Sequence, residues 1–206
     1  MTRSNIAEAV SVTILLAAGA AAQTQAEREQ AVRYLSQTRT ALMDAVEGLS
    51  DAQWKFKPAA DRWSIAEIVE HLAVVEDLVS QKVLVDLPKA QLAGADRNAK
   101  QVDAMIQAKM TDRSTKYQAP EPIVPTGRWT PVAALQHFLD SRAETMALTQ
   151  STPALREHVI AHPAFGPLDG YEWVLAVSAH TERHTKQLLE VKADPNFPAL
   201  ALSERN

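Results

Sequence analysis

The chain has 206 residues, of which 46% are hydrophobic and 22% charged, and this is enough apolar material for one domain with a sizeable core. Its 21 Lys and Arg against 25 Asp and Glu give a formal charge of -4, which excludes the basic footprint of a nucleic-acid-binding protein. Cysteine is absent, so disulfides, thiolate metal ligands and a Cys nucleophile are excluded, and a bound metal would need His, Asp or Glu ligands.

The first 22 residues have the layout of a secretory signal peptide. Arg3 precedes an apolar stretch from Ala9 to Ala22, which ends on small residues before Gln23. This stretch is too short for a secure membrane span. Glu8 is unusual in such a segment, and an Ala-rich first helix is the alternative. We predict a signal peptide over residues 1–22 and a mature domain over residues 23–206 that has no membrane span. The mature domain would then be periplasmic or secreted. If residues 1–22 are not a signal peptide, the chain would be cytoplasmic.

Four long helical patterns follow, each with apolar residues that return to one face: Ala26 to Gly48, Ser64 to about Val85, a third from Thr130, and a fourth from Asp169 to before Asp194. The second and fourth begin with capping boxes, and the third begins with a Thr cap followed by Pro. Val132 and Phe138 are expected on the buried side of the third helix. No segment alternates at period two for long enough to predict a strand. The sequence therefore predicts an all-α four-helix bundle.

A long polar connection, Asp86 to Trp129, joins the second and third helices. We expect a short helix from Val102 to Met110, and a stiff, extended segment where prolines cluster between Ala119 and Pro125. Connections of this length in a compact domain commonly cover a functional site or are disordered. We expect this one to cover a pocket in the bundle.

Three of the six histidines are placed to act together. His180 and His184 lie one turn apart on the fourth helix, on the same stripe as Trp173, so both imidazoles point inward. His71 lies at the edge of the apolar face of the second helix and can point to the same interior. Three neutral nitrogens from two helices would hold Zn²⁺ with a coordination position left open, which is the catalytic pattern.

Each of these residues also has a simpler interpretation. An inward histidine can be a hydrogen-bonded core residue without a metal. Glu67, one turn before His71, is most simply a helix cap, and a catalytic or metal-supporting role is the alternative. Gln187 could orient His184 by a hydrogen bond or be a polar boundary residue. His158 and His162 also have helical spacing, but prolines follow closely, so we expect them in a loop.

Two motifs resemble those of a known family. Trp63 to His71 resembles the W-[ST]-x-x-E-h-x-x-H signature of the DinB-like (DinB/YfiT) superfamily of metal-dependent helical-bundle enzymes, and His180 to Gln187 is similar to its H-x-x-R-H-x-x-Q signature. His162 to Leu168 is similar to the H-P-x-F-G-x-L stretch before the last helix of many members. The resemblance covers about Glu27 to Lys192. It implies that a divalent metal, usually discussed as zinc or nickel, is bound by His71, His180 and His184.

The combined prediction is a metal-dependent enzyme whose ion activates water for hydrolysis or a thiol for group transfer. Glu67 is the candidate catalytic residue. The expected partner is a small-molecule substrate, with a thiol as one candidate because some relatives use small thiols, and we keep a homodimer open. Export weakens the thiol interpretation, since small thiols are abundant in the cytosol. The alternative is a non-enzymatic, metal-stabilised module of the cell envelope that binds a ligand or a partner.

Overall fold

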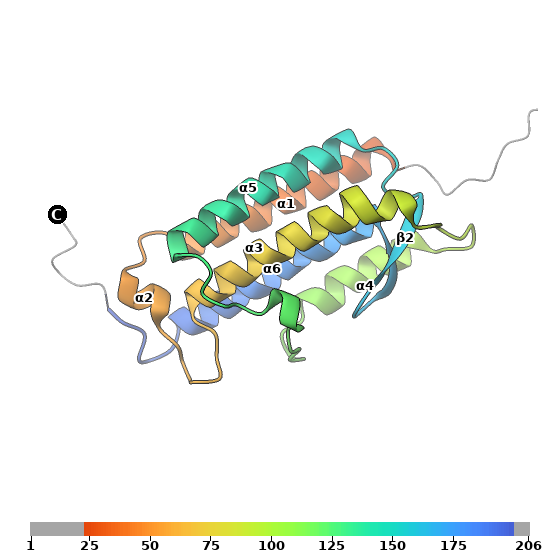
Figure 1. Cartoon of the computed structure of the whole chain (residues 1–206). Coiled ribbons are helices and arrows are strands. Elements are labelled where there is room, and N and C mark those ends of the chain that lie inside the picture. Colours follow the sequence, from red (N-terminus) through yellow and green to blue (C-terminus); the bar gives the residue numbers. More distant parts are fainter. Residues whose placement is uncertain (1–22, 200–206) are drawn as a thin grey trace, which may run out of the picture.

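The computed structural model describes residues 23–199 as a bundle of four long helices with a small sheet near one end (Figure 1). The bundle helices are α1 (Gln25–Val46), α3 (Ile65–Gln81), α5 (Pro131–Ser151) and α6 (Gly170–Lys192). Both α1 and α3 pack against α5 and α6. The predicted four-helix bundle is confirmed. The predicted signal peptide lies outside the described residues.

Side-chain caps determine where the bundle helices begin. Thr24, Ser64 and Asp169 each accept a hydrogen bond from the backbone three residues later and head a full capping box. Thr130 caps α5 and is followed by Pro131, which costs no hydrogen bond at the first helical position. The predicted starts of α3, α5 and α6 are therefore correct.

Shorter elements fill the segments between the bundle helices. The sequence patterns did not indicate the five-residue α2 (Asp51–Lys55). After α3, the chain forms a π-helical turn, a 3₁₀ turn, a short strand, a helix and a second 3₁₀ turn: η1 (Lys82–Asp86), η2 (Leu87–Lys89), β1 (Gln91–Leu92), α4 (Ala99–Thr111) and η3 (Glu121–Ile123). Helix α4 contains the predicted short helix and packs along α6.

A small three-stranded antiparallel sheet, in the order β1-β2-β3, accompanies the mostly helical fold, although the sequence patterns predicted no strand. Strand β2 (His158–His162) pairs with β3 (Gly166–Asp169) in a register that places His162 opposite Gly166. The prediction that His158 and His162 lie in a loop is therefore wrong. These strands are too short for a clear period-two signal, and Pro167 is tolerated because β3 is an edge strand.

The core consists of two apolar clusters with a polar layer between them. One cluster contains Leu35, Val79 and Trp173, and the other contains Leu42 and Phe138. Buried polar side chains lie between the clusters: Thr38, His71, Glu76, Arg142, Thr145, Thr181 and His184. Two of the three histidines predicted to bind a metal, His71 and His184, thus belong to this buried polar layer, and the half-buried His180 lies beside them.

On helix α5, the buried polar residues make the inner face hard to predict from the pattern of apolar residues. Val132, predicted on its buried side, is 73% exposed. The inner face of α5 is instead marked by Ala134, Phe138, Arg142 and Thr145, and two of these four are polar. Val132 lies about 200° around the helix from Ala134, so it faces outward. Among residues 23–199, no helix is both long and apolar enough to cross a bilayer.

Candidate metal centre

Three histidines from two bundle helices meet in the polar layer. His71 comes from α3, and His180 and His184 come from consecutive turns of α6. One ring nitrogen from each lies within 4.8 Å of the other two, and the Nε2 atoms of His71 and His180 are 3.2 Å apart. The structure therefore brings together all three histidines that the sequence singled out.

Hydrogen bonds orient two of these rings. His71 Nδ1 lies 2.7 Å from the carbonyl oxygen of Ile123, and His184 Nδ1 lies 2.8 Å from Oε1 of Gln187. Because a carbonyl or amide oxygen can only accept, each Nδ1 must carry the proton. The lone pair on each Nε2 is then free to bind a metal. Of the two interpretations of Gln187, the structure supports the one in which it orients His184.

The arrangement fits a divalent ion better than a set of core hydrogen bonds. Two nitrogens bound at about 2.0–2.1 Å in a tetrahedral site lie roughly 3.3 Å apart, close to the 3.2 Å between the Nε2 atoms of His71 and His180. His180 Nδ1 is buried and has no hydrogen-bond partner among residues 23–199. A shared ion would use the Nε2 lone pairs of His71 and His180, which converge, but it would not satisfy His180 Nδ1 on the other side of the ring.

The electrostatics favour neutral imidazoles at physiological pH. Burial lowers the pKa of His71 to about 4. Burial, reinforced by the neighbouring imidazoles, lowers the pKa values of His180 and His184 well below the usual range. The cluster contains no carboxylate from the described part of the chain. An ion held here would therefore keep its full positive charge.

Glu67, the candidate catalytic residue, lies one turn before His71 but outside the histidine cluster. Its carboxylate accepts the backbone N–H of Ser64 at 2.7 Å and Nζ of Lys57 at 2.8 Å. Partial burial alone would raise the pKa of Glu67, but these hydrogen bonds give a net lowering. Its capping function is thus visible in the geometry, and a catalytic role stays a prediction.

Comparison with known proteins places the chain in a family. The model of the DinB superfamily matches residues 34–188. The chain belongs to the DinB superfamily. The matched segment includes the three histidines on α3 and α6, in agreement with the motifs in the sequence.

Two other proteins are similar to this DinB-superfamily chain. The uncharacterized protein YuaE of Bacillus subtilis is 29% identical over 161 residues, which cover 76% of this chain and 94% of YuaE. The solved structure of YfiT from Bacillus subtilis, described as a probable metal-dependent hydrolase with an unusual four-helix bundle topology, aligns with a TM-score of 0.51 and 14% identity. That alignment covers 82% of this chain and 88% of YfiT, and at this identity it supports the fold alone.

Trp63 and Glu70 contribute to the surroundings of the DinB-type cluster in ways that the sequence analysis did not assign. The Trp63 ring lies 4.9 Å from the ring of His71 and 6.2 Å from that of His184, between centroids, so it covers one side of the cluster. The only sequence feature that pointed to Trp63 was its position at the start of the first motif, Trp63 to His71. Glu70 is buried and binds the backbone of the connection to α5. Nothing in the sequence pattern marks that contact, because its shortest hydrogen bonds come from main-chain N–H groups; the Thr126 hydroxyl and the Arg128 guanidinium also lie 3.3 Å from the carboxylate.

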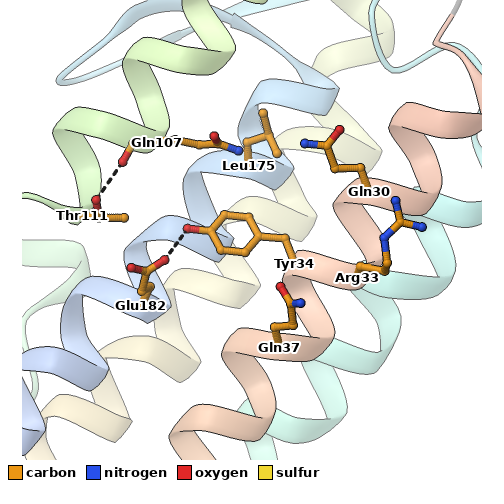
Figure 2. Close-up of a pocket in the computed structure, with 8 residues that line it drawn as sticks. All are labelled: Gln30, Arg33, Tyr34, Gln37, Gln107, Thr111, Leu175 and Glu182. Carbon is orange, nitrogen blue, oxygen red and sulfur yellow. Dashed lines mark hydrogen bonds between the residues drawn. The ribbon is translucent and has the colours of Figure 1, made fainter.

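A pocket of about 390 Å³ lies elsewhere, between α1, α4 and α6 (Figure 2). Its lining includes Glu182, which is two residues and about 200° around α6 from His180. The hydroxyl of Tyr34 donates to Glu182 at 2.7 Å across this pocket. The other lining residues are Gln30, Arg33, Gln37, Gln107, Thr111 and Leu175. This pocket therefore opens on the side of α6 opposite the histidines and is separate from the metal centre.

Proposed function

We propose that this chain is a divalent-metal-dependent hydrolase whose ion is held by His71, His180 and His184. The observation that carries the proposal is a set of three convergent, neutral nitrogen ligands whose group includes no carboxylate from residues 23–199. A structural zinc site usually has four protein ligands, whereas catalytic sites keep a position open for a substrate or water.

The nearby carboxylates that could close such a site have other partners. Glu67 caps α3 and pairs with Lys57. Glu70 accepts hydrogen bonds from the backbone of Thr126 and Gly127. These contacts support an open coordination position rather than a fourth protein ligand.

The bound ion would act as a Lewis acid that activates water near neutral pH. The surrounding residues would set its geometry. Ile123 and Gln187 hold the two Nδ1–H groups, which fixes the rings of His71 and His184 and makes them better ligands. The Trp63 ring excludes water from one side of the cluster. These contacts would preorganise the ligands.

A thiol is the second candidate substrate, because three neutral ligands leave an ion that attracts anions such as thiolates. The choice of zinc or nickel also remains part of the proposal. A purely structural metal site in a ligand-binding module is the competing function. It predicts an ion whose coordination positions are all filled by the protein and that does not exchange ligands.

The test uses the full chain loaded with Co²⁺, whose visible spectrum reports its coordination. We expect azide and a small thiol each to change the spectrum, and the Zn²⁺ form to hydrolyse at least one of a panel of activated esters and amides. His180→Ala is the inactive control. A spectrum that neither azide nor thiol changes would support a closed structural site and contradict the enzyme. Turnover that requires added thiol would favour group transfer over hydrolysis.

We also propose that residues 1–22 are removed on export, which is supported by their signal-like sequence. The intact mass of protein recovered from the native host tests this. A mature chain that begins at Gln23 is expected, and a full-length chain in the cytosolic fraction would contradict the proposal.

A further inference from the structure

The segment between α4 and α5 contacts the histidine cluster through Ile123, and we call residues 112–128 the strap. It includes η3, which carries the Ile123 carbonyl. That carbonyl accepts the hydrogen bond from His71 Nδ1 at 2.7 Å. The strap therefore contacts a candidate metal ligand directly. In Figure 1, η3 is the short green helix that lies beside the bundle.

Glu70 holds the end of the strap nearest α5. Its carboxylate accepts the backbone N–H groups of Thr126 at 2.7 Å, Gly127 at 2.9 Å and Arg128 at 3.4 Å. The Glu70 side chain is 4% exposed, so its carboxylate is shielded from water in these charge-assisted bonds. Gly127 has a φ of 73°, a left-handed conformation that lets successive N–H groups turn toward one carboxylate.

Arg183 holds the other end. Its guanidinium donates to the carbonyl oxygens of Asp112 and Thr115, the latter at 2.5 Å. It also lies 5.2 Å from the centre of the Tyr117 ring, within range of a cation–π interaction. The side chain is buried against this part of the strap.

These two charged residues are the sequence neighbours of metal ligands. Glu70 precedes His71 on α3, and Arg183 precedes His184 on α6. Adjacent helical residues point about 100° apart, so one side chain of each pair can face the cluster while the other reaches the strap. Movement of either helix turn would therefore displace a ligand and a strap anchor together.

We infer that Glu70 and Arg183 are positioning residues that fasten the strap over the metal centre, so that metal binding and strap closure stabilise each other. The inference rests on the proposed function, because it requires the histidines to bind an ion. An ion that fixes the His71 ring favours the conformation in which its Nδ1–H meets Ile123. By reciprocity, a fastened strap raises metal affinity.

Trypsin cleavage after Lys116, an exposed residue of the strap, tests this coupling. Couplings between sites are typically about 5- to 150-fold, so we expect Zn²⁺ to slow this cleavage at least about fivefold in the wild-type chain. Glu70→Gln places an amide NH₂ against backbone N–H donors. We expect it to speed cleavage without metal, to remove most of the protection by Zn²⁺, and to weaken zinc binding in a chelator competition.

Glu121→Gln is the matched control, because it removes the same charge from an exposed side chain of the strap itself. It should behave as the wild type in both assays. Gly127→Ala is a second variant that keeps Glu70. A Cβ there meets no atom within 4 Å, so its effect comes from backbone strain at positive φ. We expect a smaller loss of protection in the same direction, at an unchanged circular dichroism spectrum.

The outcomes separate the inference from the proposed function. A wild-type chain that takes up no zinc overturns both. A chain that binds zinc while its strap is cleaved at the same rate as without metal overturns the inference alone. The inference is also overturned if Glu70→Gln and Gly127→Ala both fold and both keep the wild-type protection and zinc affinity.

Discussion

Arg142 and Glu76 form an ion pair at the centre of the bundle, and breaking it is expected to destabilise the domain strongly. Both side chains are fully buried. Arg142 makes five hydrogen bonds: two to Glu76 and one each to the carbonyl of Leu35, the hydroxyl of Thr38 and the hydroxyl of Thr181. The guanidinium has five N–H donors, so all are used. The pair thus ties α1, α3, α5 and α6 together.

Arg142→Met removes the cation and leaves the carboxylate of Glu76 buried, with the Thr145 hydroxyl still donating to it at 3.1 Å. Removing one partner of a buried ion pair costs about 3–5 kcal/mol. We expect that loss in the free energy of unfolding. Replacing both partners with apolar residues of similar volume is often neutral or stabilising. The double variant Glu76→Leu, Arg142→Met should therefore recover most of the loss.

Urea unfolding of the metal-free protein, followed by circular dichroism, measures these differences without a contribution from metal binding. The slope of free energy against urea should be similar in all variants, so that shifts in midpoint report stability. A loss below about 1 kcal/mol in Arg142→Met, the size expected of a surface pair, would refute the reasoning. So would a double variant no more stable than the single one.

Three further predictions concern the centre and its surroundings. Gln187→Leu removes the acceptor for His184 Nδ1 and should weaken zinc binding about 10- to 100-fold in a chelator competition, and equal affinity would contradict the orienting role. Glu67→Gln keeps a residue that can cap α3, so the melting temperature should not change. If Glu67 is a general base, kcat should fall about 10²-fold or more. An unchanged kcat would limit the role of Glu67 to capping. Burial lowers the pKa of His162 from 6.5 in the unfolded chain to about 4 in the folded chain. As the pH falls below 6.5, the unfolded state therefore binds a proton that the folded state does not, and the free energy of unfolding decreases until about pH 4. His162→Phe should lose less stability over that range in metal-free urea unfolding, and a parallel decline would contradict this.

The histidine cluster could be predicted from the sequence because its parts have local signals and because the two motifs that contain the three histidines resemble those of the DinB superfamily. His180 and His184 have the spacing of one helical turn, and the cap at Ser64 fixes the phase of the helix that carries His71. Both helices are long enough for their inner faces to be read from the pattern of apolar residues. The common site then follows from packing two such faces together.

The surroundings of the cluster could not be predicted in the same way. Strand β2 is five residues long and its partner β3 four, too short for a periodic pattern. The inner face of α5 carries Arg142, so hydrophobicity does not mark it. The shortest hydrogen bonds of Glu70 and the contact of the Ile123 carbonyl involve main-chain atoms of the connection, which no side-chain pattern encodes. The sequence did not show how the connection between α3 and α5 runs past the histidine cluster.

The metal content of the protein tests the central claim most directly. Elemental analysis of the chain purified without a polyhistidine tag should find about one equivalent of zinc or nickel, because three preorganised imidazoles bind such ions tightly. His180→Ala, with an unchanged circular dichroism spectrum, should retain almost none. A folded wild-type chain without divalent metal, or a His180→Ala variant with a full equivalent, would contradict the account.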